Sequence, residues 1–408
     1  MTKIDALREI VRDGGLFMEQ DQPDLVDRVM TSTMVERAKY GTVEVAMGVR
    51  RSGKSTLLYC AGRALKEMGR RVFYVNFEDE RFIPRDSDLA DLSSLLELDS
   101  SVLMLDEPQN MPGWERWVRR MHDRGMKVYV TGSNTTLLGS EISTALAGRK
   151  VEHEVFPFSF PEFLAARDAG DPPSDQLLRL LEEYMTIGGF PYPTVHDDPS
   201  ILVEYRRDVI ERDVLMRHRI SAPVRFRDLV RFIMSNPGVY LSSKSVKGFL
   251  KISHPTLRRY LSYLEDAYAV IAMEKFSHSH KVRTMNPKKV YPIDNGLLVR
   301  RRDRGHLLES CVVQHLRRST TELYYWKDER GREVDVYLPE DDLAVQVVYD
   351  LDEDNLEREE RPLASAADEF SSRGVIVYMQ SSVESSYPTL RATELLVGDP
   401  LERLRAVP

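Results

Sequence analysis

The chain has 408 residues, of which 42% are hydrophobic and 30% charged, and its formal net charge is −8. This composition is typical of a soluble protein of two or three domains and excludes a wholly disordered chain. Apolar runs stay well short of the ~20 residues of a membrane-spanning helix, and the amphipathic N-terminal segment lacks the apolar core of a secretory signal. We therefore expect a cytoplasmic protein with no membrane role. Cys60 and Cys311 are too few and too far apart for a disulfide scaffold.

The first third of the chain alternates short apolar runs with helical patterns. The runs at residues 43–47, 72–77, 101–105 and 127–131 predict buried strands, and the segment 54–68 predicts a helix. Strands that alternate with helices indicate a parallel sheet covered on both faces. The expected fold class is therefore α/β.

The strongest chemical pattern is GVRRSGKS at residues 48–55, a full match to G-x-x-x-x-G-K-[ST] between a predicted strand and a predicted helix. Its glycines let successive backbone N–H groups point at phosphates, at a helix N-terminus that favours anions. Lys54 is expected to reach the β- and γ-phosphates, and Ser55 to supply a hydroxyl to Mg²⁺. ATP and Mg²⁺ are thus the predicted cofactors. The predicted nucleotide-binding residues are Gly48, Arg50, Arg51, Ser52, Gly53, Lys54, Ser55 and Thr56.

Two acids follow the buried run at 102–105, at the strand edge where parallel sheets bind ligands. Asp106 is expected to hold Mg²⁺ through water, and Glu107 to orient and polarise the attacking water. The next strand ends in TGSN, where Ser133 or Asn134 would sense the γ-phosphate. A strand-to-helix cap is the alternative for these two residues.

Arg149 follows a predicted helix at 136–146. An arginine that reaches the γ-phosphate of a neighbouring subunit stabilises phosphoryl transfer and requires a homo-oligomer. An ordinary surface arginine is the alternative. The candidate catalytic residues are Lys54, Glu107, Asn134 and Arg149.

The order of these motifs resembles one family. The segments GVRRSGKST, LMLDEPQNMPGWERWV, TGSN, LAGR, FPFSFPEF and GGFP follow one another along the chain. The chain is similar in this to archaeal and bacterial AAA-type ATPases that fuse a P-loop domain to a winged-helix segment and a C-terminal restriction-endonuclease-like module. The resemblance implies ATPase roles for Lys54, Ser55, Asp106, Glu107 and the Ser133-Asn134 turn, and it adds weight to Arg149 as an arginine that acts in trans. Pro108 departs from the family pattern. The implied domains are 1–155 (P-loop ATPase), 156–220 (helical linker), 221–293 (winged helix-turn-helix) and 294–408 (endonuclease-like).

The segment 244–289 is basic in an otherwise acidic chain, with ten Lys or Arg and three Asp or Glu. Helical patterns at 241–250 and 257–267, followed by hairpin-like runs, predict a winged helix-turn-helix whose second helix enters the major groove of DNA. The candidate DNA contacts are Lys244, Lys247, Arg258, Arg259, Lys281 and Arg283. A packing or protein-binding module with a solvated basic surface is the alternative.

A restriction-endonuclease-like core places an acid on a helix, an Asp on a strand and E-x-K on the next strand, where the carboxylates bind Mg²⁺ and the lysine helps activate water. Glu309 and Asp335 match the first two positions, but the third begins at Gln346 and has Val348 in place of the lysine. We therefore expect a degenerate nuclease site at Glu309, Asp335 and Gln346, kept for packing or for gripping DNA.

The leading hypothesis is an ATPase whose nucleotide state is coupled to DNA binding. A slow ATP-dependent regulatory switch that engages a protein partner is the second hypothesis. A nucleotide-gated nuclease is the third and least favoured, because the lysine is missing.

Overall fold

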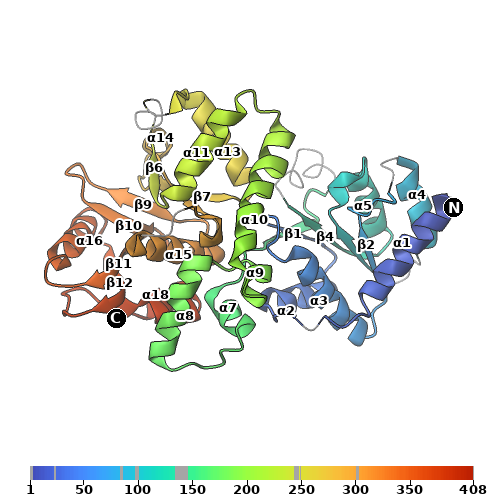
Figure 1. Cartoon of the computed structure of the whole chain (residues 1–408), viewed down its shortest axis with the longest axis horizontal. Coiled ribbons are helices and arrows are strands. Elements are labelled where there is room, and N and C mark those ends of the chain that lie inside the picture. The colour runs from blue at the N-terminus through green and yellow to red at the C-terminus, as the bar shows by residue number, and fades with distance from the viewer. Residues whose placement is uncertain are drawn as a thin grey trace. The chain divides into compact units, whose positions relative to one another are not determined.

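The computed structural model describes residues 3–22, 24–82, 86–96, 101–133, 146–242, 248, 250–299 and 303–407 (Figure 1). The chain divides into two compact units, Met1–Val155 and Phe156–Pro408. Within the described ranges, no helix is both long enough and apolar enough to cross a membrane. The two units are taken in turn.

The first unit is built on a five-stranded parallel sheet in the order β2-β3-β4-β1-β5. Its strands are β1 (Val43–Met47), β2 (Val72–Asn76), β3 (Val102–Asp106), β4 (Lys127–Gly132) and β5 (Lys150–Glu154). Strands β1, β3 and β4 are buried along their whole length, as parallel strands between two helical layers must be. The predicted α/β parallel sheet is confirmed. The sequence pattern missed β5, because KVEHE is a polar run at the edge of the sheet.

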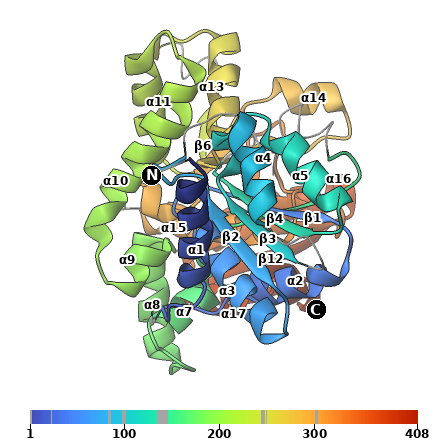
Figure 2. The same ribbon diagram turned by 90° about the vertical axis from the view of Figure 1, so that its right-hand side faces the viewer.

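Helices cover both faces of this sheet, with α2 and α3 on one side and α4 and α5 on the other (Figure 2). The helices are α1 (Lys3–Phe17), α2 (Val29–Glu36), α3 (Lys54–Glu67), α4 (Asp86–Leu95) and α5 (Trp114–Asp123), with short 3₁₀ turns η1 (Arg37–Lys39) and η2 (Pro108–Asn110). Leu57 and Leu58 of α3 pack on Met104 and Tyr129 of the sheet. On the other face, Trp117 of α5 is fully buried, and its ring meets Phe77 edge to face. This packing fixes the start of α3 against the ends of the central strands.

The second unit contains an eight-stranded sheet in the order β13-β12-β11-β10-β9-β7-β8-β6. The strands are β6 (Val239–Leu241), β7 (Val270–Lys275), β8 (Lys288–Pro292), β9 (Tyr324–Lys327), β10 (Glu333–Leu338), β11 (Leu343–Leu351), β12 (Arg373–Ser381) and β13 (Thr389–Arg391). The helices are α7 (Phe160–Ala166), α8 (Ser174–Ile187), α9 (Pro191–Val195), α10 (Leu202–Asp208), α11 (Pro223–Ser235), α13 (His254–Asp266), α14 (His280–Met285), α15 (Arg304–Ser319), α16 (Leu356–Phe370), α17 (Ala392–Val397) and α18 (Pro400–Ala406). Shorter helical turns are η4 (Pro199–Ile201), the π-helical η5 (Val209–Met216) and η6 (Asn295–Leu297).

One strand pair joins the two halves of this sheet. Strands β6, β8 and β7 form an antiparallel ribbon, and β7 then pairs in parallel with β9, so that Glu274 lies opposite Tyr324. Beyond β9 the sheet continues through β10 and β11 to β13. Side chains of β8 are therefore brought within reach of β10 although more than 40 residues separate them in the chain.

The glycine pair of GGFP has a structural reason. Gly188 has φ +77°, and a Cβ on it would lie 1.9 Å from Oδ1 of Asp294. The backbone N–H of Gly189 donates to Oδ2 of the same carboxylate at 2.9 Å. Phe160, in the FPFSFPEF segment, donates its N–H to Nε2 of the buried His315. The glycine pair is thus tied to the residue before η6 and the FPFSFPEF segment to α15, which accounts for both motifs without any catalytic role.

Candidate functional site

The loop after β1 is the centre of the candidate nucleotide site. It leaves the carboxyl edge of the sheet at Met47 and enters α3 at Lys54. Gly53, the residue before the helix, has φ +93°, a left-handed conformation that glycine adopts without steric cost. A Cβ on Gly48 would lie 2.2 Å from the carbonyl oxygen of Val155, so only glycine fits this close approach. The two motif glycines are thus required by the backbone path itself.

The side chain of Lys54 is curled into this loop. Its Nζ donates to the carbonyl oxygens of Gly48 and Val49 at 3.0 and 2.9 Å. Arg28, the residue before α2, stabilises the loop by donating a hydrogen bond to the carbonyl oxygen of Ser52 at 2.9 Å. The buried hydroxyl of Ser52 has no hydrogen-bond partner among the described residues. A loop with a buried ammonium and an unsatisfied hydroxyl fits an anion that accepts hydrogen bonds, as phosphate does.

The other predicted loop residues lie around this centre. Arg51 is exposed with φ +68°, and Ser55 is exposed on the first turn of α3. Thr56 is half-buried, and Arg50 lies 3.7 Å from a carboxylate oxygen of Glu78. Their contacts with a nucleotide stay a prediction.

Asp106 ends β3 and is held from both neighbouring strands. Tyr74 of β2 donates its hydroxyl to Oδ2 at 2.7 Å, and the Thr131 hydroxyl of β4 donates to Oδ1. Burial, followed by the Asp106 charge, raises the pKa of Tyr74 far above its usual range, so the phenol stays a donor. Carboxylate and hydroxyl oxygens are the ligands that Mg²⁺ prefers, so Asp106 and Ser55 fit the predicted metal roles.

Glu107 adopts a strained backbone. Its φ of +53° is left-handed, which is uncommon for a non-glycine residue, and the following Pro108 disfavours it further. Such a conformation costs on the order of 1–3 kcal/mol and persists only where contacts hold it. The Glu107 N–H donates to Thr131 Oγ1 at 3.2 Å, and Pro108 starts the 3₁₀ turn η2. The Thr131 contact therefore helps to hold Glu107 in this conformation, and the chain turns into η2 directly after it.

The Glu107 carboxylate lies among polar groups. Its Oε2 accepts a hydrogen bond from Nε2 of Gln109, and the Ser133 hydroxyl lies 3.4 Å away. Burial raises the pKa of Glu107, and the positive charge of Lys54 acts in the opposite direction. Asn134 and nearly all of the predicted helix 136–146 lie outside the described residues. The structure thus brings Lys54, Asp106, Glu107 and Ser133 together at one edge of the sheet.

Three residues of this site escaped the sequence analysis: Tyr74, Gln109 and Thr131. Thr131 bridges both acids, because its hydroxyl donates to Asp106 and accepts from the N–H of Glu107, whereas the sequence analysis considered only Ser133 and Asn134 of this segment, as γ-phosphate sensors. Thr131 could have been recognised from its position near the end of β4, because β4 pairs with β3, the strand that ends in Asp106. Tyr74 is recognisable only once β2 is known to be the other neighbour of β3.

Arg149 lies at the opposite edge of the same sheet. Its carbonyl oxygen accepts from the N–H of Val43, where β1 begins, whereas the P-loop follows the end of β1. The guanidinium is 40% exposed and lies 3.2 Å from Asp123. It is therefore remote from the P-loop of its own subunit, and a catalytic role in trans stays a prediction.

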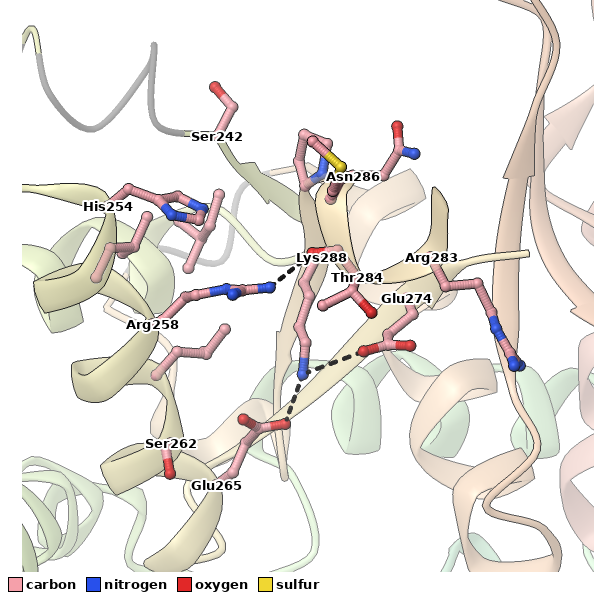
Figure 3. Close-up of a pocket in the computed structure, with 15 residues that line it drawn as sticks. Ser242, His254, Arg258, Ser262, Glu265, Glu274, Arg283, Thr284, Asn286 and Lys288 are labelled. Atoms are coloured by element: carbon pink, nitrogen blue, oxygen red, sulfur yellow. Dashed lines mark hydrogen bonds and ion pairs between the residues drawn. The ribbon is translucent and has the colours of Figure 1, made fainter. Parts of the chain in front are cut away.

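The described basic candidates of the second unit lie on two helices, Arg258 and Arg259 on α13 and Lys281 and Arg283 on α14. Arg259 and Lys281 are exposed, while Lys244 and Lys247 lie outside the described residues. Arg258 reaches across a cavity of about 510 Å³ and donates to the carbonyl of Thr284 at 2.7 Å (Figure 3). Arg283 instead contacts the ring and the hydroxyl of Tyr324. Among the described candidates, Arg258 and Arg283 therefore line one cavity, whereas Arg259 and Lys281 are exposed outside its lining.

In the same cavity, Lys288 lies 3.4 Å from Glu265 and 3.8 Å from Glu274 (Figure 3). These ion pairs join α13 to the two longer strands of the ribbon, β7 and β8. Burial raises the pKa of Glu265, and the adjacent Lys288 opposes that rise. The basic charge of this region is thus partly neutralised within the fold.

The three predicted nuclease-like residues do line one cavity, of about 730 Å³. Glu309 extends from α15, Asp335 from β10 and Gln346 from β11. Val348 is packed in the apolar core of the sheet, so no cation comes from that position. A cation that the sequence analysis did not assign to this site, Lys289 of β8, lies 2.5 Å from Glu309. Lys289 and Glu309 are 20 residues apart in the chain, so no local sequence motif connects them.

Comparison with known proteins matches three segments to family models. Residues 41–164 match an AAA domain, and residues 178–305 and 304–391 match domains of unknown function, DUF8612 and DUF4143. Among solved structures, AMPPCP-bound DnaA from Aquifex aeolicus covers 61% of this chain and 90% of its own, with 14% identity and a TM-score of 0.29. A DNA replication initiation factor covers 58% and 86%, with 12% identity and a TM-score of 0.28.

Two curated relatives span most of the chain. A Haemophilus influenzae protein is 28% identical over 335 residues, which are 75% of this chain and 82% of the relative. The protein MJ1544 of Methanocaldococcus jannaschii is 34% identical over 346 residues, 78% of this chain and 77% of the relative. The chain therefore belongs to the same protein family as MJ1544 of Methanocaldococcus jannaschii, and its residues 41–164 form an AAA domain of the P-loop ATPase type.

Proposed function

We propose that this protein binds and hydrolyses ATP with Mg²⁺ in its first unit, and that the second unit couples the nucleotide state to DNA. The observation that carries the ATPase part is the convergence of Lys54, Asp106 and Glu107 at one sheet edge. Their elements, α3 and β3, are each buried in the core, so the three side chains are positioned before any ligand arrives.

Each residue has a distinct role in this proposal. The loop N–H groups and Lys54 hold the phosphates, and Lys54 exchanges its two loop carbonyl partners for phosphate oxygens. Ser55 and Asp106 hold Mg²⁺, which supplies charge neutralisation at the β- and γ-phosphates when bound. Tyr74 and Thr131 fix the orientation of the Asp106 carboxylate.

Glu107 orients the attacking water. Burial raises the pKa of Glu107 and the charge of Lys54 opposes that rise; the ionised carboxylate is the form that accepts a proton or a hydrogen bond from water. Arg149 acts on the site of a neighbouring subunit, which requires a homo-oligomer. Its place at the far edge of its own sheet and its exposure support an action in trans rather than within one subunit.

The coupling to DNA rests on the segment 221–293, which we assign as a winged helix. Its described elements follow in the order α11, β6, α13, β7, α14 and β8, and the three strands form one antiparallel ribbon in which β8 lies between β6 and β7. Ser253 caps α13 by accepting from Thr256 N–H, and Arg258 and Arg259 follow in the next turn on its exposed side. That placement suits contact with phosphates or base edges.

Steady-state ATP hydrolysis with and without duplex and single-stranded DNA tests this proposal, with Glu107→Gln as the blank. We expect the wild type to hydrolyse ATP faster than the blank, and we expect this rate to increase when DNA is added. Turnover that DNA leaves unchanged would favour a regulatory switch with a protein partner. Turnover equal to the blank in all conditions would refute the ATPase assignment.

A further inference from the structure

Three carboxylates of the second unit converge on one ammonium group. The Nζ atom of Lys289 lies 2.5 Å from Glu309, 2.7 Å from Glu333 and 3.3 Å from Asp335. We name these three acids the carboxylate cluster. Lys289 is only 4% exposed, so its charge is compensated by these contacts and not by water. The ammonium donates hydrogen bonds to Glu333 and Asp335 and forms an ion pair with Glu309.

We infer that Lys289 takes the place of a divalent cation in the carboxylate cluster, as a counter-ion supplied by the chain itself. The cluster is then a metal-independent tie between β8, β10 and α15. This inference does not depend on the proposed ATPase, because no residue of the first unit takes part in it.

Geometry makes the ammonium and a metal ion mutually exclusive. A Mg²⁺ ion binds carboxylate oxygens at about 2.0–2.1 Å. An ion bound to the same three oxygens would have to occupy the space that Nζ fills. Among the described residues, no group of three or more His, Cys, Asp or Glu side chains is arranged to hold a metal ion.

The oxygens of the cluster are fixed independently of Lys289. Tyr291 donates its hydroxyl to Glu309, and the backbone N–H of Val347 donates to Asp335 at 3.0 Å. Lys327 lies 3.3 Å from the second oxygen of Glu333. Each carboxylate therefore has a second contact, besides Lys289, that helps to hold it in position.

Gln346 adds a further oxygen acceptor to one of the cavities that the cluster lines. Gln346, 8% exposed, lines the same cavity as the cluster, and its Oε1 has no hydrogen-bond partner among the described residues. A buried carbonyl oxygen without a donor is uncommon in folded proteins. Besides the three carboxylates, the cavity therefore presents an amide oxygen, and oxygen atoms are the ligands that a hard divalent ion prefers.

Small ions have access to the cluster from solvent. Two cavities, of about 750 and 730 Å³, share Glu309, Glu333 and Asp335 in their linings. The ammonium, rather than a closed surface, therefore keeps a metal out. A lysine that activated water in a metal-dependent nuclease would have to leave the carboxylates available to the metal, whereas Lys289 contacts all three.

Manganese binding to the nucleotide-free full chain, followed by electron paramagnetic resonance, tests the inference. We expect the wild type and Glu309→Gln to bind the same number of Mn²⁺ ions, since the intact cluster takes none. Lys289→Met should gain one Mn²⁺ site with an affinity at least tenfold above any in the wild type, and its melting temperature should rise with Mn²⁺. Lys327→Met, which removes a lysine that contacts one carboxylate only, is the matched control and should gain no site.

Loss of Lys289 leaves buried carboxylates unpaired, so Lys289→Met is also refolded in Mn²⁺ and in EDTA. Folding in Mn²⁺ alone supports the inference as directly as a new site does. A Mn²⁺ site in the wild type that Glu309→Gln removes would overturn it. So would Mn²⁺-dependent nicking of supercoiled plasmid by the wild type that Asp335→Ala abolishes, or a folded Lys289→Met without a new site. The comparison of wild type with Glu309→Gln decides even if Lys289→Met folds in neither condition.

Discussion

Tyr74 and Asp106 are joined across two neighbouring strands, with the phenol donating to the carboxylate at 2.7 Å inside the core of the first unit. Both side chains are nearly inaccessible to water. The contact fixes one oxygen of the predicted magnesium-binding carboxylate, while Thr131 fixes the other.

Tyr74→Phe should therefore remove one hydrogen bond to Asp106 while the phenyl ring still fills its place in the core. A hydrogen bond to a charged group contributes about 1.5–3 kcal/mol, so we expect a loss of unfolding free energy in that range. The Mg²⁺ concentration that gives half-maximal ATP turnover should shift several-fold, with the KM for ATP at saturating Mg²⁺ nearly unchanged. Urea unfolding and Mg²⁺ titration of turnover measure the two effects. An unchanged Mg²⁺ dependence would show that the tyrosine is a packing residue only.

Lys54→Ala and Glu107→Gln should separate binding from chemistry. The alanine variant loses the ammonium that reaches the phosphates, so turnover should vanish and nucleotide affinity fall. The glutamine variant keeps its shape but loses the charge that orients water, so turnover should fall by about 10²–10³ with affinity retained. Equilibrium binding of a fluorescent ATP analogue and phosphate release give both quantities. A parallel loss of affinity in Glu107→Gln would mean that Glu107 is structural.

Arg149→Ala should lose turnover while keeping ATP affinity, if the arginine serves the neighbouring subunit. Mixing it with Lys54→Ala provides a sharp test, because each variant retains the part that the other lacks. Turnover should reappear in the mixture, measured by phosphate release after subunit exchange. Arg119→Ala, which removes another arginine near Asp123, is the control and should keep turnover. A mixture as inactive as its components would argue against action in trans.

Arg259→Glu should weaken DNA binding and reduce its salt dependence. Each lost phosphate contact lowers the slope of log K against log salt by about one. Arg259 is a cleaner choice than Arg258, which also holds Thr284 and so supports α14. Arg179→Glu on α8 makes the same charge change on an exposed helix elsewhere in the unit. Fluorescence anisotropy at several salt concentrations distinguishes the two, and equal effects would point to a nonspecific charge response.

Glu44 should make the first unit sensitive to acid. Burial raises its pKa, but hydrogen bonds, with His153 and Lys127 first among them, outweigh this and hold the pKa of Glu44 at about 2. Because the folded-state pKa is below the unfolded value, the stabilisation is full above about pH 4.5 and disappears as the pH falls towards 2. We expect a loss of about 2 kcal/mol over that window, less than the full shift because solvent screens part of the cluster. Urea unfolding at several pH values should show this loss in the wild type, and Glu44→Gln should lack it.

The sequence predicted those parts of the site that lie close together along the chain. The P-loop and the Asp-Glu pair each occupy one short segment, and their chemistry depends on local spacing. Tyr74 and Thr131 became visible only through the strand order, because nothing in a chain pattern says which strand lies beside β3. The polar edge strand β5 was missed for a related reason, since apolar runs mark central strands only.

Lys289 shows the same limit at longer range. The endonuclease-like pattern expects a lysine at position 348, two residues after the predicted ligand Gln346, but the chain has a valine there. The cation comes instead from β8, which reaches the carboxylates because β7 pairs with both β8 and β9. Such a replacement depends on sheet connectivity and leaves no trace in local spacing.

The pairing of β7 with β9 has a consequence for how this family can be rearranged. The two family models meet at residues 304–305, between strands that belong to a single sheet. A chain cut there would expose the backbone edges of β7 and β9 and leave the carboxylates without Lys289. The two segments should therefore unfold in one cooperative transition and be inherited together, as one evolutionary module rather than two.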